Sequence, residues 1–187
     1  MKTVLGELID YIKHPVLEKD PNTAVFYRLK KLISLFFISL GTSIVLTIII
    51  SFLEESNLVS TGKHSIEELL KDTSGLYFFI YAVVFAPIIE ELIFRAPLTL
   101  FKKPVYFRIS FYTFAVVFGF LHIINYEITL DIILFSPILI APQLCIGLYL
   151  GFIRIRFGLL WSIALHAAYN GFLAMLFLLA KDAIKQM

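Results

Sequence analysis

The stretch LISLFFISLGTSIVLTIIISFL, residues 32–53, decides the fold class of this chain. It holds 22 residues without a charged side chain, between Lys30-Lys31 on one side and Glu54-Glu55 on the other. A helix needs about 20 apolar residues to cross the hydrocarbon core of a bilayer. The stretch therefore predicts a membrane-spanning helix.

Four more apolar stretches follow, at residues 76–100, 105–124, 132–153 and 157–180. Long uninterrupted runs of this kind are typical of helices, because a transmembrane β-strand alternates apolar and polar side chains. We therefore expect an all-α polytopic membrane bundle of about five transmembrane helices. A break between Pro137 and Pro142 would raise this number to six.

The parts outside these runs are more polar. Residues 1–31 are predicted to form an amphipathic segment in the cytosol or at the membrane surface, and residues 54–75 a polar loop with a short helix at 66–70. Residues 76–181 would form a single helical bundle.

The composition excludes several classes of protein. Hydrophobic residues make up 59% of the chain and charged residues 16%, whereas a soluble domain carries about 25% charged residues. An ordinary soluble domain and a disordered chain are therefore excluded. The net charge of +2 gives no indication of nucleic acid as a partner.

The distribution of positive charge predicts the orientation in the membrane. With five spans, 11 lysine and arginine residues fall on the side of the N-terminus and 4 on the other side. The side with the excess of lysine and arginine is normally cytoplasmic. We therefore expect the N-terminus inside and the C-terminus outside, in the cell (inner) membrane.

The second apolar stretch carries charges that are costly inside a membrane. Glu90, Glu91 and Arg95 fall within it, and an ionised side chain near mid-membrane costs about 2.5–3.5 kcal/mol on insertion scales. Glu91 and Arg95 have the i, i+4 spacing of a helical ion pair. Glu90 then lacks a local counter-charge and is a candidate general base.

Three more polar residues lie on the later spans. His122 is near the end of the third span, and His166 and Asn170 are four residues apart on the fifth, which places them on one helix face. We expect these residues to converge with Glu90. Glu90 and His122 would activate water, and His166 and Asn170 would donate hydrogen bonds to an oxyanion. This is the chemistry of peptide-bond hydrolysis.

Other uses of the same residues stay open. Glu90, His122 and His166 together form a ligand set found in catalytic zinc sites, although the chain has no HExxH motif. The site would thus require either no cofactor or zinc. A histidine inside a membrane can also serve only as an interhelical hydrogen-bond partner. Gly147 and Gly151 form a GxxxG pattern, which indicates close helix packing and permits a homodimer.

Three short motifs on different predicted spans resemble those of a known family. They are EExxxR at residues 90–95, FxxxH at residues 118–122 and HxxxN at residues 166–170. In this order the motifs resemble the CPBP (Abi) intramembrane proteases, a family of CAAX proteases and bacteriocin-processing proteins that includes the CAAX prenyl endopeptidases. The resemblance covers about residues 76–180.

The resemblance implies an intramembrane endopeptidase that acts on a membrane-associated polypeptide. It implies that Glu90 is the catalytic glutamate that activates water together with His122. It also implies that His166 and Asn170 stabilise the oxyanion. The family is often labelled metalloprotease, and the resemblance leaves a glutamate-dependent and a metal-dependent mechanism open.

Glu91 and Arg95 correspond to the supporting residues of the first motif. The chain departs from many family members directly after Arg95, where Ala96-Pro97 stands in place of a small residue, often glycine, without a proline. Pro97 is expected to end or kink the helix at this point.

Two other functions compete with proteolysis. A non-proteolytic membrane scaffold or immunity-type partner could keep the family fold without its chemistry. Buried glutamate and histidine also mark ion pathways in transporters, but five spans without an internal repeat do not favour a transporter.

The predicted site meets one geometric difficulty. Glu90 lies about 21 Å along its span at 1.5 Å per residue, whereas His122 lies near the end of a span that runs back. The two side chains reach one depth only if helices are tilted, short or broken. Pro87, Pro97 and Pro104 mark positions for such breaks.

Overall fold

The computed structural model describes residues 3–59 and 74–185, which form helices joined by loops and contain no strand. The short helix predicted at residues 66–70 lies outside the described residues. Five helical stretches are long and apolar enough to cross a membrane. The prediction of an all-α, multi-pass bundle is thus confirmed.

The first stretch is α2 (Val25–Glu55), which begins before the predicted start at residue 32. The second stretch changes helical type along its length. It consists of α4 (Gly75–Ile80), a π-helical turn (Tyr81–Phe85), α5 (Ala86–Phe94) and a 3-10 turn (Ala96–Leu100). The third is α6 (Pro104–Leu121), which ends in a 3-10 turn (His122–Asn125). The fifth is α9 (Leu159–Lys185).

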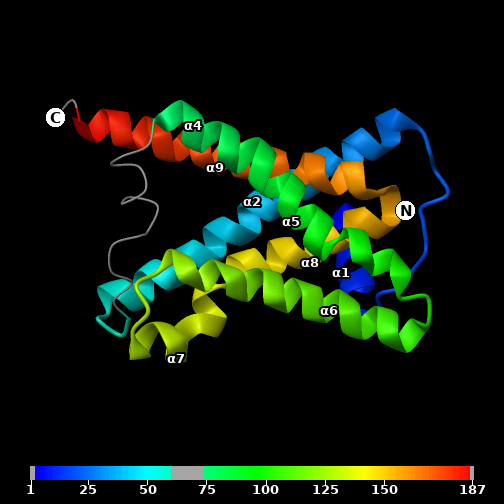
Figure 1. The fold of residues 1–187 in the computed structure, drawn as a ribbon, viewed down its shortest axis with the longest axis horizontal. Helices are drawn as coiled ribbons and strands as arrows, with labels where there is room; N and C mark the ends of the chain where they lie inside the picture. The colour runs from blue at the N-terminus through cyan, green and yellow to red at the C-terminus, as the bar shows by residue number, and fades with distance from the viewer. Residues whose placement is uncertain (1–2, 60–73, 186–187) are drawn as a thin grey trace.

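The fourth stretch is broken where the sequence places its two prolines. It consists of α7 (Leu130–Leu139) and α8 (Ala141–Phe157), with the break at Ile140. Pro142 has no N–H to continue the hydrogen-bond ladder of α7. The 10 residues of α7 reach only about 15 Å, so the break adds no sixth span. Accordingly, α1 and the end of α9 lie toward opposite ends of the bundle (Figure 1).

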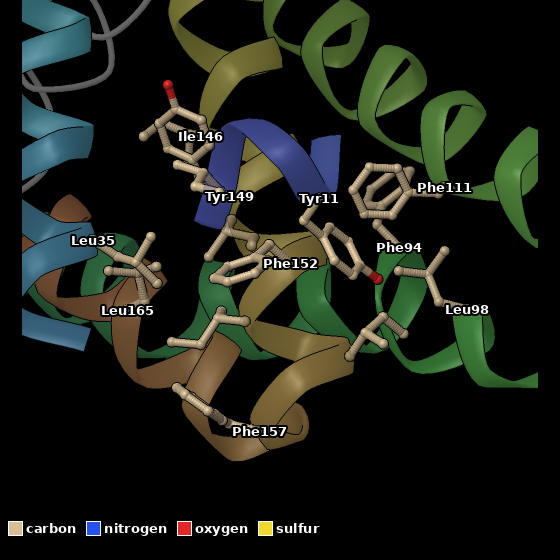
Figure 2. Close-up of a cluster of buried hydrophobic side chains, with 14 of the residues drawn as sticks. Tyr11, Leu35, Phe94, Leu98, Phe111, Ile146, Tyr149, Phe152, Phe157 and Leu165 are labelled. Carbon is tan, nitrogen blue, oxygen red and sulfur yellow. The ribbon is translucent and has the colours of Figure 1, made fainter. Parts of the chain in front are cut away.

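Helix α8 runs through the centre of the molecule, with α2, α6 and α9 packed around it. Its apolar side chains form the middle of the main hydrophobic cluster (Figure 2). A Cβ on Gly151 would lie 2.7 Å from Phe111 Cε2, and one on Gly147 would lie 3.2 Å from Phe118 Cδ1. The close packing predicted from these glycines is therefore confirmed, and it joins α6 to α8 within one chain.

The N-terminal helix α1 (Val4–Lys13) packs on protein. Leu8 and Tyr11 are buried, and both belong to the main hydrophobic cluster. Glu7 on the same helix forms an ion pair with Lys31 of α2. Helix α1 thus covers one end of the bundle, which we call the basic end. The lysine and arginine residues of this end that the structure describes are Lys13, Lys19, Arg28, Lys30, Lys31, Lys102, Lys103, Arg108, Arg154 and Arg156.

Asp20 ties the segment between α1 and α2 to this end. Its backbone N–H donates to the Arg156 carbonyl at 3.0 Å, and its Oδ2 accepts from the Tyr27 hydroxyl at 3.1 Å. Arg156 Nη2 lies 3.5 Å from the same oxygen. Burial alone would raise the pKa of Asp20, but the Asn22 N–H, Tyr27 and Arg156 outweigh it and hold this pKa below its usual value.

Candidate active site

The two adjacent glutamates on α5 differ in their surroundings. Glu91 is completely buried, and its Oε1 lies 3.6 Å from Nε of Arg95, which is equally inaccessible. The predicted i, i+4 pair is thus confirmed. Two buried charges need additional partners to offset their desolvation, and other helices provide these partners.

Arg95 contacts both neighbouring helices. Its guanidinium carbon lies 4.0 Å from the centre of the Phe118 ring on α6, and its Nη2 donates to the Gly147 carbonyl on α8 at 3.4 Å. The Arg95 carbonyl in turn accepts from Arg154 Nε at 3.0 Å. The arginine of the first motif therefore joins α5, α6 and α8 rather than facing substrate.

Glu91 also binds two side chains on α9. Ser162 Oγ donates to Glu91 Oε2, and His166 Nδ1 lies 3.1 Å from Glu91 Oε1. Ser162 and His166 are four residues apart and therefore share one helix face. Because a carboxylate only accepts, the His166 proton at this contact is on Nδ1. Glu91 thereby fixes the orientation of the His166 ring.

Glu90 faces the other edge of the same imidazole. Glu90 Oε2 and His166 Nε2 are 3.6 Å apart, which is longer than a hydrogen bond. The Glu90 side chain is 28% exposed, yet its Oε2 is buried and has no hydrogen-bond partner among the described residues. His166 therefore stands between a glutamate that is fully paired and one whose oxygen is available to a reactant.

His122 lies in the 3-10 turn that ends α6. Its Nδ1 is 2.8 Å from the Phe118 carbonyl, so Nδ1 donates the proton and Nε2 is left as the acceptor. The Phe118 ring centre is 4.9 Å from that of His122 and 5.8 Å from that of His166. Phe118 thus contacts both histidines and connects His122 to the rest of the site.

Asn170 is held by an irregularity in the second stretch. Its Nδ2 donates to the Ala82 carbonyl at 3.0 Å. In the π-helical turn the Ala86 N–H bonds to Tyr81 instead, and the next residue that could reach the Ala82 carbonyl, Pro87, has no N–H. The proline therefore leaves a carbonyl free, and Asn170 binds it.

A cavity of about 670 Å³ brings the predicted residues together. His122, His166 and Asn170 all line it, and Glu90 adjoins it through His166. The other lining residues are mostly apolar or aromatic: Tyr77, Phe78, Tyr81, Ala82, Phe118, Asn125, Gln143, Ile146, Tyr169, Leu173, Ala174 and Phe177. A mostly apolar pocket with a few convergent polar groups is the usual form of a small binding site inside a protein.

The alternative zinc site finds no support in this geometry. Within residues 3–59 and 74–185, no group of three or more histidine, cysteine, aspartate or glutamate side chains is placed to hold a metal ion. Each histidine uses Nδ1 for its contact, His122 with a backbone carbonyl and His166 with Glu91. This leaves Nε2 of both rings open, so the ligand set Glu90, His122 and His166 stays a prediction.

The structure adds site residues to which the sequence analysis assigns no role. Ser162 is fully buried against Glu91, and its position one turn before His166 was the available signal. Phe118 belongs to the second motif. Its contacts with Arg95 and both histidines depend on how the helices pack, which the motif alone does not reveal. Gln143 lines the cavity with a buried Oε1 that has no hydrogen-bond partner in the described part of the chain. Gln143 follows Pro142 in an apolar run, and no sequence pattern indicates that it belongs to the site.

Comparison with known proteins identifies the family of the chain. No curated protein and no solved structure matches the chain. One family model, described as type II CAAX prenyl endopeptidase Rce1-like, matches residues 72–172 and thus more than half of the chain. The matched region contains Glu90, Glu91, His122, His166 and Asn170. The chain belongs to the Rce1-like family of type II CAAX prenyl endopeptidases.

Proposed function

We propose that this protein is an intramembrane endopeptidase that hydrolyses a peptide bond of a membrane-associated polypeptide with Glu90 as its general base. One observation carries the proposal. The cavity that His122, His166 and Asn170 line adjoins a glutamate whose Oε2 is 3.6 Å from His166 Nε2 and has no hydrogen-bond partner among the described residues.

Hydrolysis begins with proton transfer from water to Glu90. The water oxygen attacks the carbonyl carbon of the substrate as its proton passes to Glu90 Oε2. Glu90 suits this step because Arg95 pairs with Glu91 instead. His122 lines the same cavity with Nε2 as its free acceptor and orients the water.

His166 and Asn170 are the proposed donors to the oxyanion. With Nδ1 bound to Glu91, His166 donates through Nε2–H when the ring is an imidazolium, and Glu91 and Arg95 hold it in place. Asn170 uses one Nδ2–H for the Ala82 carbonyl and retains a second. Donors fixed in place before the reaction are worth about 10²- to 10³-fold in rate each.

The intermediate then collapses. The C–N bond breaks as Glu90 returns the proton to the leaving nitrogen, which gives a carboxylic acid and an amine. The acid proton then passes to the amine, which leaves a carboxylate and an ammonium group. One water is consumed, and Glu90 ends as a carboxylate. In this scheme the reaction requires no metal ion, and activity should persist when a chelator such as 1,10-phenanthroline is present. Loss of activity that added zinc restores would instead assign a metal-dependent mechanism.

The lipid bilayer and a membrane-associated polypeptide are the proposed partners, in the cell (inner) membrane. A homodimer would need a face other than Gly147 and Gly151, because α6 covers this pair.

The test compares protein N-termini in membranes from cells that produce equal amounts of wild type, Glu90→Gln or Glu127→Gln. Glu127 is exposed just beyond His122, so the second variant removes a nearby carboxylate outside the site. We expect new N-termini with wild type and Glu127→Gln and none with Glu90→Gln. If all three profiles are identical, or if a phenotype persists in Glu90→Gln, the non-proteolytic scaffold or immunity-type role is favoured.

A further inference from the structure

The cavity and the basic charges lie at opposite ends of the bundle. Helix α1, the loop before α6 and the loop between α8 and α9 make up the basic end. The cavity instead involves α4, the end of α6 and the start of α8, which Figure 1 shows toward the other end. We call this the cavity end.

Exposure along the cavity shows which way it opens. Phe118 and His166 lie at its inner part and are each 2% exposed. Tyr77 and Tyr81 on the second stretch also line it, and they are 66% and 52% exposed. Tyr77 lies in the first turn of α4, near the end of a span, where tyrosine commonly meets the membrane–water interface. The cavity therefore runs from the histidines toward the surface at the cavity end.

The basic end offers no comparable entrance. Leu8 and Tyr11 of α1 fill the hydrophobic cluster there, and Asp20 bonds to Arg156 at the end of α8. The Tyr112 hydroxyl on α6 also donates to the Ile12 carbonyl at 2.6 Å. The N-terminal segment is thus bound to α6 and α8, and it covers the end of the bundle through which a substrate would otherwise approach.

One polar group inside the cavity suits a polypeptide better than a lipid chain. Gln143, on the first turn of α8, has a buried Oε1 without a hydrogen-bond partner in the described part of the chain. A buried amide oxygen without a hydrogen-bond partner is unfavourable. Backbone N–H and C=O groups of an extended peptide can bind either end of this amide, whereas an acyl or prenyl chain can bind neither.

We propose that the substrate is a polypeptide segment on the non-cytoplasmic side of the membrane, which enters the cavity at the cavity end and meets Gln143. The inference rests on the proposed function for its chemistry. The side of the membrane from which the substrate enters is inferred from the excess of lysine and arginine, which places the basic end in the cytoplasm. The cleaved bond then lies in the half of the membrane remote from the cytoplasm.

The first test measures sidedness without any activity. Cys145 is the sole cysteine, and its replacement by serine gives a background for single cysteines. Glu127→Cys reports the cavity end and Lys103→Cys the basic end, and both native side chains are exposed. We expect a membrane-impermeant maleimide to label Glu127→Cys on intact cells and to label Lys103→Cys only after permeabilisation. The reverse pattern would overturn the proposal.

The second test maps the cuts. Among N-termini that depend on Glu90, we expect those within segments on the non-cytoplasmic side. Cuts that depend on Glu90 but fall in cytoplasmic segments would overturn this inference and leave the proposed function standing. An absence of Glu90-dependent cuts would overturn the proposed function, and the substrate assignment with it, while the labelling result would still report which end faces out.

The role of Gln143 has a separate readout. With a peptide that spans a mapped cut, Gln143→Leu should raise KM by about three- to tenfold, as expected for one lost hydrogen bond, with little change in kcat. Gln143→Asn, which keeps the amide, should recover part of this effect. An unchanged KM in both variants would remove Gln143 from the substrate site.

Discussion

The two ends of the bundle use polar side chains in opposite ways. At the basic end, Asp20, Lys31 and Arg156 are bound to one another or to the backbone. At the cavity, Glu90 Oε2 and Gln143 Oε1 are buried without hydrogen-bond partners in the described chain. Native proteins leave few such groups, and each calls for an explanation. Polar groups at the basic end thus stabilise the fold, whereas under the proposed function those at the cavity are left available for substrate.

Within the site itself, some polar side chains are paired and others are not. Both carboxylate oxygens of Glu91 have partners, on Arg95, Ser162 and His166. Next to the cavity, Glu90 Oε2 and Gln143 Oε1 are buried without hydrogen-bond partners among the described residues. The first prediction therefore concerns the buried pair of Glu91 and Arg95.

The largest effect on stability is expected from Arg95→Met. Removal of one partner of a buried ion pair leaves an uncompensated charge, here on Glu91, and costs about 3–5 kcal/mol. Thermal unfolding in detergent measures this loss. Glu91→Gln combined with Arg95→Met should be less destabilised than Arg95→Met alone. Equal loss in both would mean that the pair is not what stabilises α5.

Asn170→Ala tests a side chain that lines the cavity. We expect about a 10²- to 10³-fold fall in kcat, as for loss of one oxyanion donor, with little change in unfolding temperature.

Pro87→Ala is its partner variant. It restores an N–H that can bond within the second stretch, so Asn170 loses the free Ala82 carbonyl and kcat should fall in part. Full activity in Pro87→Ala would contradict the role of the π-helical turn.

Ser162→Ala removes the hydroxyl that donates to Glu91. Loss of a hydrogen bond to a buried charged group costs about 1–3 kcal/mol. Ser39→Ala is the matched control, because Ser39 is also buried but its Oγ has no hydrogen-bond partner among the described residues. Unfolding measurements should show a loss for Ser162→Ala and none for Ser39→Ala. Equal losses would mean that burial alone, and not the contact with Glu91, determines the effect.

The smallest effect is expected at the basic end, from Asp20→Asn. A carboxylate whose pKa is lowered in the folded state stabilises the fold above its unfolded pKa, and this contribution disappears as the pH falls through the folded pKa. Asp20→Asn should therefore lose about 1.5 kcal/mol at pH 7. The difference from wild type should begin to shrink near pH 3.8 and vanish only below the folded pKa, which is lower than 3.8. Exposed Glu18 provides the control, as Glu18→Gln. A pH-independent difference would contradict the charge-based account.

The sequence predicts the five spans and the helical pair of Glu91 with Arg95, because run length and i, i+4 spacing are local properties. It also predicts that His122, His166 and Asn170 come together, and all three line the cavity, whereas the apolar and aromatic lining residues and Gln143 were not predicted. The contact between Asn170 and Ala82 could not be predicted, since it depends on a proline that lies far from Asn170 in the chain. The expected difficulty of depth is met by irregular helices, because the second stretch contains a π-helical turn and α6 ends in a 3-10 turn, and His122 lines the same cavity as His166.

The most direct test of the central claim is cleavage of a peptide that spans a mapped cut by purified protein in water enriched in ¹⁸O. Wild type should place one ¹⁸O atom in the new carboxylate, and Glu90→Gln should be slower by about 10²- to 10⁴-fold, the usual contribution of a general base. Equal rates in the two proteins, or a product without ¹⁸O, would contradict glutamate-dependent hydrolysis.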